Sequence, residues 1–295
     1  MKFVTLADLA ATIRRNVHKI PHDVDFVIGV PRSGMIAASI IAEFLNVPLI
    51  DVDSFALYGA LPTGGRRSRF HRQTVTEMPH VLVVDDTMFH GHSLKNTKNK
   101  LEPFVPFSRK FEYKFVYMAV FLEGPNCGVD IWLEDLRQYT DGYTTFVLYE
   151  WNIFHHVPKF MGKCIYDIDG VLCLDPPDER SGRPYMDYIP NAVPLFTPTV
   201  KEGELVSYRM ERYSVLTEWW LHNQGVTYGA LTMFPANSYD ERAGMGISPA
   251  AFKTDIYRLR SWAKLFVESD DRQAREIYGL TGQPVYSVET NKIYE

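Results

Sequence analysis

Residues 81–93 read VLVVDDTMFHGHS, in which four apolar residues, two carboxylates and a short polar loop follow one another. The apolar run predicts a buried strand over residues 81–84. Because unpaired carboxylates are costly in an apolar core, we expect the strand to end there, with Asp85 and Asp86 facing solvent. The loop from Thr87 leads into a predicted helix from Leu94 onward, and N–H groups at such a corner bind anions. The stretch therefore indicates an α/β fold with a site for a phosphorylated sugar.

A second stretch, FVIGVPRSGMIAASIIAEFL at 26–45, repeats the order of apolar strand, tight turn and apolar helix. Gly29 and Gly34 permit backbone geometry that other residues avoid, while Arg32 and Ser33 offer hydrogen-bond donors where the helix begins. By itself this segment is also compatible with an ordinary strand–helix turn whose arginine lies in solvent. Its place about 50 residues before the acidic pair favours a second ligand-binding loop.

Together, the two stretches resemble the donor site of type I phosphoribosyltransferases, which use phosphoribosyl pyrophosphate (PRPP). In that family the first loop binds pyrophosphate, the paired acids bind the ribose hydroxyls and the second loop binds the 5-phosphate. Gly91 is kept here, whereas His90 and Ser93 replace the two threonines of the family's loop. The resemblance implies that PRPP is bound by Arg32, Ser33, Gly34, Asp85, Asp86, Thr87, His90, Gly91, His92 and Ser93.

Between these stretches, residues 58–73 contain a dense basic cluster after the pair Gly64 and Gly65. Arg66, Arg67 and Arg69 suit a mobile lid that neutralises a bound pyrophosphate. The cluster also lies where type I phosphoribosyltransferases carry their flexible catalytic loop. A basic surface patch, including one for nucleic acid, is the alternative.

Composition limits the remaining possibilities. The chain has 295 residues, of which 46% are hydrophobic and 23% charged, with a net charge of −5. Two domains are expected, and the acidic balance argues against nucleic acid as a partner. Three cysteines (Cys127, Cys164 and Cys173) without metal-ligand spacing fit a reducing cytoplasm. We expect neither a signal peptide nor a membrane span, which leaves peripheral membrane association and a homo-oligomer open.

The pattern changes near residue 155. Before it, apolar strands alternate with helical stretches, which is typical of a parallel sheet. Residues 149–163 are rich in aromatic and basic residues and are interpreted as a junction, and adjacent His155 and His156 are interpreted as part of a packed linker rather than as metal ligands. We therefore expect domains at 1–157 and 158–295.

The second domain opens with CIYDIDGVLCLDP at 164–176. Asp167 and Asp169 are two residues apart, so both side chains can project from a strand end to one side, and Gly170 permits a tight turn. An acidic turn without function is the alternative. The segment resembles the first motif of haloacid dehalogenase-like hydrolases, in whose phosphatases the first aspartate attacks phosphorus and the second is the general acid and base.

Further motifs of that family follow in the expected order. Ser207, at the end of an apolar strand, suits the hydroxyl that holds the phosphoryl group; Thr217 competes for this role but reads better as part of a helix. Lys253 suits the ammonium that neutralises charge at the nucleophile. Within 268–271 the metal ligands are ambiguous, with Glu268 and Asp270 preferred. The resemblance thus implies Mg²⁺ held by Asp167, Asp169, Glu268 and Asp270.

Spacing between these motifs predicts little or no cap over the second site. The proline-rich stretch 175–199 is too irregular for a folded cap domain. An open site fits a phosphate carried on a large molecule, although a second copy of the chain could cover it.

We therefore predict an α/β protein of two domains, each a parallel sheet flanked by helices: first phosphoribosyltransferase-like, then a haloacid dehalogenase-like Rossmannoid. The pairing resembles PRPP-dependent ribofuranosyl transfer to bacterial polysaccharides: ribose 5-phosphate is transferred to a glycan and its 5-phosphate is removed. One alternative is a nucleobase phosphoribosyltransferase coupled to a nucleotidase. Another is a regulatory PRPP-binding module.

Overall fold

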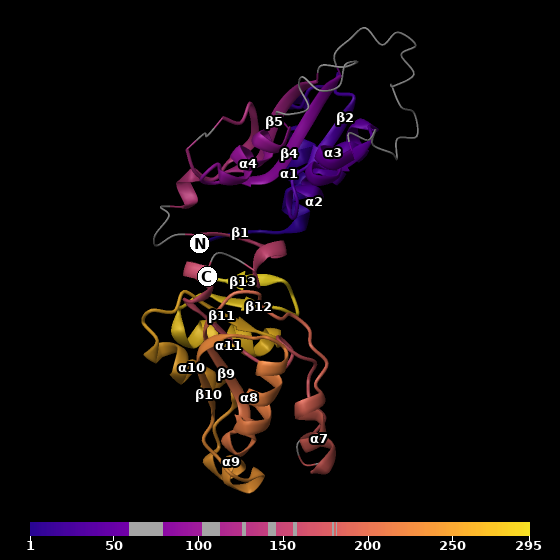
Figure 1. The fold of residues 1–295 in the computed structure, drawn as a ribbon. Coiled ribbons are helices and arrows are strands. Elements are labelled where there is room, and N and C mark those ends of the chain that lie inside the picture. Colours follow the sequence, from indigo (N-terminus) through magenta and orange to yellow (C-terminus); the bar gives the residue numbers. More distant parts are fainter. Residues whose placement is uncertain are drawn as a thin grey trace. The chain divides into compact units, whose positions relative to one another are not determined.

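The computed structural model describes residues 1–58, 79–101, 113–125, 128–140, 146–155, 158–178, 180 and 182–295. The chain divides into two compact units, Met1–Trp151 and Asn152–Glu295 (Figure 1). The expected boundary after residue 157 lies a few residues beyond this division. The basic cluster with Arg66, Arg67 and Arg69 lies outside the described residues.

The first unit contains a parallel sheet in the order β3-β2-β4-β5-β6. Its strands are β2 (Phe26–Gly29), β3 (Leu49–Asp51), β4 (His80–Met88), β5 (Lys114–Leu122) and β6 (Ile131–Asp135). A separate parallel pair joins β1 (Lys2–Val4) to β7 (Val147–Tyr149). This pairing brings the residues around position 150 back to the start of the unit.

Helices cover both faces of the five-stranded sheet. Helices α1 (Leu6–Arg15) and α2 (Gly34–Leu45) pack on the face that presents Val27, Leu82 and Val84. Helices α3 (Val52–Tyr58) and α4 (His92–Leu101) pack on the opposite face, with Val81 and Val83. Successive strand residues point to opposite faces, and both faces are buried. This explains why the strands read as continuous apolar runs.

Short 3₁₀ helices complete the described part of the first unit: η1 (Val17–Lys19), η3 (Arg137–Tyr139) and η4 (Glu150–Asn152). The start of α1 is fixed by a capping box, in which the Thr5 side chain accepts from the backbone of Asp8 and the Asp8 carboxylate accepts from that of Thr5. Such reciprocal bonds satisfy N–H groups that a helix start leaves without partners.

One expectation about the first unit is wrong. Strand β4 does not end at Val84 but runs on to Met88, so the acidic pair and Thr87 lie within the strand. Asp86 is only 2% exposed rather than solvent-facing. A buried carboxylate is tolerated where hydrogen bonds compensate for lost water, and Asp86 has such bonds from parts of the chain remote in sequence.

The second unit has a sheet in the order β10-β9-β8-β11-β12-β13. Its strands are β8 (Cys164–Tyr166), β9 (Glu202–Met210), β10 (Tyr228–Phe234), β11 (Leu265–Glu268), β12 (Val285–Ser287) and β13 (Lys292–Tyr294). Neighbouring strands are parallel, except that β13 runs antiparallel to β12.

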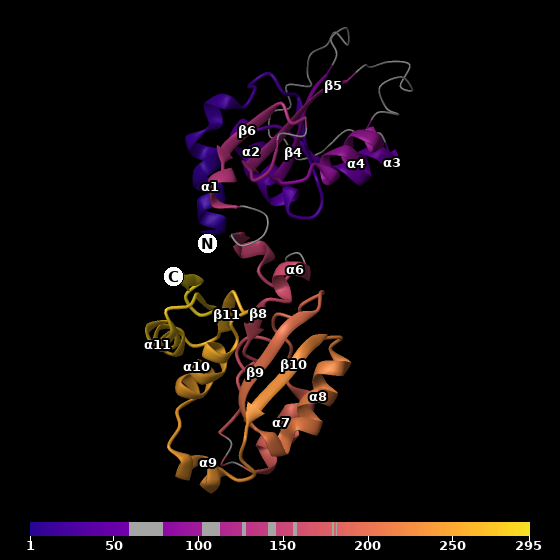
Figure 2. The same ribbon diagram turned by 90° about the vertical axis from the view of Figure 1, so that its left-hand side faces the viewer.

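Helices α7 (Arg183–Asn191) and α8 (Ser214–Asn223) lie on one side of this sheet, and α10 (Pro249–Leu259) and α11 (Asp271–Thr281) on the other (Figure 2). The remaining helices are α6 (Pro158–Met161), α9 (Tyr239–Met245) and η6 (Glu211–Tyr213). Within the described part of the proline-rich stretch, α7 is the only α-helix. Among the helices that the structure describes, none combines the length and apolar character that crossing a membrane requires.

Candidate active sites

In the first unit, the two loops predicted to bind PRPP meet at the carboxyl edge of β2 and β4. These strands are parallel neighbours. The Ser33 hydroxyl, just after β2, donates to Asp86 Oδ1 over 3.0 Å. Gly34 packs so closely that a Cβ there would lie 2.9 Å from Asp85 Oδ1. Only glycine fits at this position without moving the carboxylate, while Arg32 beside it is exposed.

Asp85 accepts a hydrogen bond from the first turn of α4. The Ser93 hydroxyl donates to Asp85 Oδ2 over 2.9 Å, and the backbone N–H of Asp86 donates to Oδ1 over 3.0 Å. Burial, together with the charge of Asp86, raises the pKa of Asp85 well above its ordinary value. A bound ligand that donates hydrogen bonds here would favour the ionised carboxylate.

The loop itself lies at the start of α4. Gly91 adopts the left-handed conformation, with φ of 73°, and the rings of His90 and His92 are 6.0 Å apart. A cavity of about 430 Å³ is lined by these three residues together with Leu94, Lys95, Lys98 and Asn99. The N-terminus of α4 and Lys95 near it make this cavity suitable for an anion, whereas Lys98 lies in the last turn of α4 and donates to the Gly128 carbonyl over 2.8 Å.

The sequence analysis missed a second set of contacts in this unit. The Trp151 indole N–H donates to Asp86 Oδ2 over 2.7 Å, and the Trp151 ring lies 4.9 Å from that of Tyr149. The Tyr149 hydroxyl in turn donates to Glu123 Oε1 over 2.7 Å. The start of the predicted junction is therefore part of the first site, because β7 pairs with β1 and carries Tyr149 inward.

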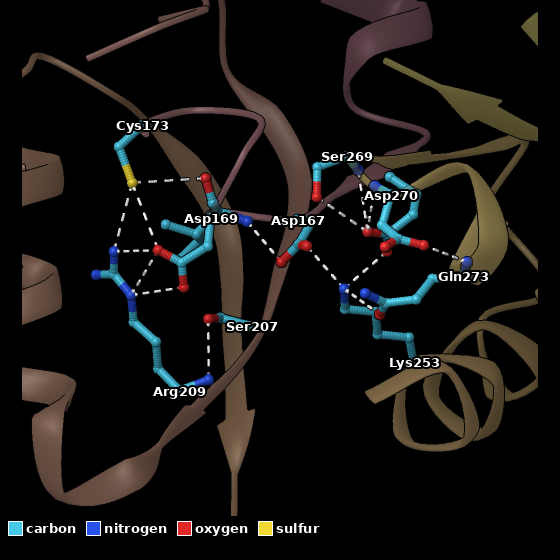
Figure 3. Close-up of polar contacts among 11 residues, drawn as sticks. Asp167, Asp169, Cys173, Ser207, Arg209, Lys253, Ser269, Asp270 and Gln273 are labelled. Atoms are coloured by element: carbon cyan, nitrogen blue, oxygen red, sulfur yellow. Dashed lines mark hydrogen bonds and ion pairs between the residues drawn. The ribbon is translucent and has the colours of Figure 1, made fainter. Parts of the chain in front are cut away.

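In the second unit, Lys253 lies between two carboxylates. Its ammonium donates to Asp167 Oδ2 over 2.7 Å (Figure 3). It also donates to Glu268 Oε2 over 2.7 Å. Asp167 follows β8, Glu268 ends β11 and Lys253 is on α10; all three are buried. Burial raises the pKa of Asp167, although Lys253 opposes that rise. Burial alone would lower the pKa of Lys253, but the two carboxylates raise it, so the ammonium is charged at neutral pH.

Asp169 is paired with Arg209, a residue that the sequence analysis did not select. The Arg209 guanidinium donates to the two Asp169 oxygens over 2.6 and 2.9 Å (Figure 3). The Arg209 side chain is fully buried. Burial alone would lower the pKa of Arg209, but the charge of Asp169 and the hydrogen bonds to it keep this pKa above its ordinary value. Arg209 lies two residues after Ser207 on β9. The period of two along a strand, which places both on one face, was the signal that could have identified it.

The two hydroxyls considered for the phosphoryl site both contact Arg209. Ser207 is buried on β9, and its hydroxyl accepts from the Arg209 backbone N–H over 3.1 Å. Thr217 lies in α8, as expected, and its hydroxyl accepts from Arg209 Nη1 over 3.3 Å. The competing candidates are thus separated: one is on the strand, the other on a helix beside the guanidinium.

The four predicted metal ligands do not form a ready cation site. Carboxylate oxygens suit Mg²⁺ chemically, but Asp169 is occupied by Arg209, and Glu268 is fully buried against Lys253 and the backbone N–H groups of the next two residues. Asp270 caps α11 by accepting from the Gln273 backbone. Among the described residues, no three His, Cys, Asp or Glu side chains are grouped to hold a metal. Glu268 is better understood as a counter-ion of Lys253.

A cavity of about 260 Å³ is lined by Asp167, Asp169, Arg209 and Lys253. Beyond the catalytic candidates, Tyr185, Tyr208 and Arg242 contribute to its wall. The Arg242 guanidinium lies 4.6 Å from the centre of the Tyr208 ring and donates to the Tyr208 carbonyl over 3.0 Å. Aromatic faces and a cation beside a carboxylate suit a sugar phosphate. Sequence reasoning missed these three residues, which come from separate elements.

Comparison with known proteins supports part of the sequence analysis. Residues 3–111 match the family model described as the phosphoribosyl transferase domain, which confirms that resemblance for this part of the chain. No curated protein matches the chain.

Several solved structures are similar to the chain. Purine phosphoribosyltransferase from Pyrococcus horikoshii Ot3 has 16% identity and a TM-score of 0.34, with 51% of this chain and 95% of that chain covered. Orotate phosphoribosyltransferase from Aeropyrum pernix has 18% identity and a TM-score of 0.31, with coverage of 45% and 71%. Xanthine-guanine-hypoxanthine phosphoribosyltransferase from Helicobacter pylori has 16% identity and a TM-score of 0.33, with coverage of 51% and 94%.

Proposed function

We propose that the chain is a bifunctional enzyme: its first unit transfers ribose 5-phosphate from PRPP to an acceptor, and its second hydrolyses the 5-phosphate of the product. The match of residues 3–111 to the phosphoribosyl transferase domain supports the first reaction. The observation that carries the proposal is that the same chain holds a buried Asp167–Lys253 pair at the wall of a cavity, because that chemistry suits removal of a phosphate.

In the first reaction, Asp85 and Asp86 would accept hydrogen bonds from the ribose hydroxyls. Their positions are fixed by Ser93 and Ser33, respectively. The loop of His90, Gly91 and His92 would hold the 5-phosphate, and Arg32 the pyrophosphate. Mg²⁺ remains a prediction for this site, since phosphoribosyltransferases generally use it together with PRPP.

In the second reaction, Asp167 would attack phosphorus as the bond from phosphorus to the ribose 5-oxygen breaks. Lys253 lowers the repulsion between this carboxylate and an anionic phosphate. Asp169 would protonate the leaving oxygen and later take a proton from the water that attacks phosphorus, as the bond from phosphorus to Asp167 breaks and inorganic phosphate leaves. The Asp169 carboxylate is bound by the Arg209 guanidinium, and a phosphate that competes for the guanidinium would release Asp169 for proton transfer.

We propose a glycan as the acceptor, with net transfer of a ribofuranosyl unit. The second site is consistent with this acceptor, since α7 is the only α-helix described between Asp169 and Ser207 and a large acceptor needs an open approach. A nucleobase acceptor would instead make the second reaction a nucleotidase step.

The test uses labelled PRPP with nucleobases and oligosaccharides as acceptors, and compares the full chain with Asp167→Asn. The variant should still transfer phosphoribose but should accumulate a product that retains its phosphate, visible by mass spectrometry. Asp255→Asn, an exposed change on α10, is the matched control. If the Asp167→Asn product carries no extra phosphate, the second unit does not process the first unit's product. Transfer to nucleobases alone would replace the glycan acceptor with nucleotide chemistry.

A further inference from the structure

Glu123 lies at the carboxyl edge of the first unit's sheet, directly after β5. Its backbone N–H and that of Gly124 donate to the carbonyl of Met88, over 2.8 and 3.2 Å. A Cβ at Gly124 would lie 1.9 Å from the Phe89 carbonyl oxygen. Only glycine permits this approach, which holds Glu123 against the segment between the acidic pair of β4 and the predicted phosphate loop.

The Glu123 carboxyl group has one oxygen fixed and one available. Oε1 accepts from the Tyr149 hydroxyl over 2.7 Å, whereas no described residue donates a hydrogen bond to Oε2. The side chain is half-buried. The pKa of Glu123 is raised to about 7, mainly by burial; the Tyr149 hydroxyl opposes this rise and the charge of Asp86 adds to it. A carboxyl with a pKa near neutrality exchanges protons efficiently at physiological pH.

The same small network positions Glu123 and the donor site. Trp151 donates to Asp86, and its ring packs on Tyr149, which donates to Glu123. Among the described residues, the charged and titratable groups that face Glu123 are Tyr149 from β7 and Asp86 from β4. A donor whose ribose is bound by Asp86 would place its reacting carbon near this edge, where the acceptor must also approach.

We propose that Glu123 is the general base of the first reaction and that Tyr149 is a positioning residue for it; this inference rests on the proposed function. The acceptor oxygen forms a bond to C1 of PRPP while the bond from C1 to pyrophosphate breaks, and pyrophosphate leaves with the electron pair. The acceptor proton passes to Glu123 Oε2 and is later released to solvent.

The test replaces Glu123 with Gln, which can still accept from Tyr149 but cannot take a proton. The probe is PRPP alone, with water as the acceptor and pyrophosphate release as the readout. The rate should fall by about 100-fold, the low end of general base catalysis, while PRPP affinity by calorimetry is unchanged. Glu43→Gln, an exposed change on α2, should have no effect.

The pH profile separates a chemical role from a structural one. In the unmodified chain the rate should rise with pH through about 7, because the base must be ionised, and Glu123→Gln should lack this limb. Tyr149→Phe removes the hydrogen bond from the Tyr149 hydroxyl, which lowers the pKa of Glu123. In this variant the rise in rate should therefore occur at a higher pH. If Glu123→Gln keeps the full rate and limb, the base assignment is overturned but the transferase stands. If the unmodified chain neither binds PRPP nor releases pyrophosphate, the proposed function is overturned and this inference falls with it.

Discussion

Lys253→Met offers a strong test of how the second unit is held together. The change keeps most of the side chain's volume but removes the ammonium that donates to Asp167 and Glu268, each over 2.7 Å. Both carboxylates are buried and would lose their shared cation. Removing one partner of a buried ion pair costs about 3–5 kcal/mol. If the free energy of unfolding falls by about 2 kcal/mol per molar urea, the urea concentration at the unfolding midpoint should fall by about 1.5–2.5 M.

Hydrogen exchange in urea, followed on peptides from β8 and β11, reports this loss for the second unit alone. Lys201→Met, at an exposed position, is the control. Burial raises the folded-state pKa of Asp167 above its ordinary value, and loss of the Lys253 ammonium, which opposes that rise, raises this pKa further. Protonation then stabilises the fold at low pH, and this stabilisation is lost as pH rises. The loss of stability caused by Lys253→Met should therefore be smaller at about pH 5 than at about pH 8.

Two results would refute this reasoning. One is a loss of unfolding free energy no larger than about 1 kcal/mol, which is typical of an exposed ion pair. The other is a deficit that does not depend on pH. Either would mean that the two carboxylates are not held in the fold by Lys253.

Three further predictions concern other parts of the chain. Asp85→Asn should weaken PRPP binding by about 1.5–3 kcal/mol per lost charged hydrogen bond, measured by calorimetry, and unchanged affinity in the folded variant would contradict the ribose-binding role. Cys173, whose pKa burial raises to about 12, should resist iodoacetamide at neutral pH in the native chain; rapid alkylation of its peptide in mass spectrometry would show that the pocket opens readily. Thr5→Ala should destabilise the first unit by about 1 kcal/mol through loss of the α1 cap, read from exchange of α1 amides, whereas Thr5→Ser should largely preserve the cap; equal losses in both variants would exclude the hydroxyl as the cause.

The sequence by itself indicated the strand–turn–helix order of β2 with α2 and of β4 with α4, because apolar runs and glycine-containing turns act over a few residues. It did not indicate α7, which lies in the proline-rich stretch. It also indicated the loop chemistry of the first unit: Ser33 and Ser93 do lie beside the acidic pair. The same local reasoning placed the end of β4 wrongly. Burial of Asp86 depends on donors from other strands, which no local pattern reveals.

Only the tertiary structure decided which charges pair. Lys253 meets Asp167 across 86 residues of sequence, Trp151 meets Asp86 across 65 and Arg209 meets Asp169 across 40. Each pair forms because the fold brings residues from separate strands and helices together, and the low polarity there makes an unpaired charge costly. A sequence motif gives the chemical type of each residue. Whether a carboxylate is free for a ligand or bound by a neighbouring cation depends on that three-dimensional pairing.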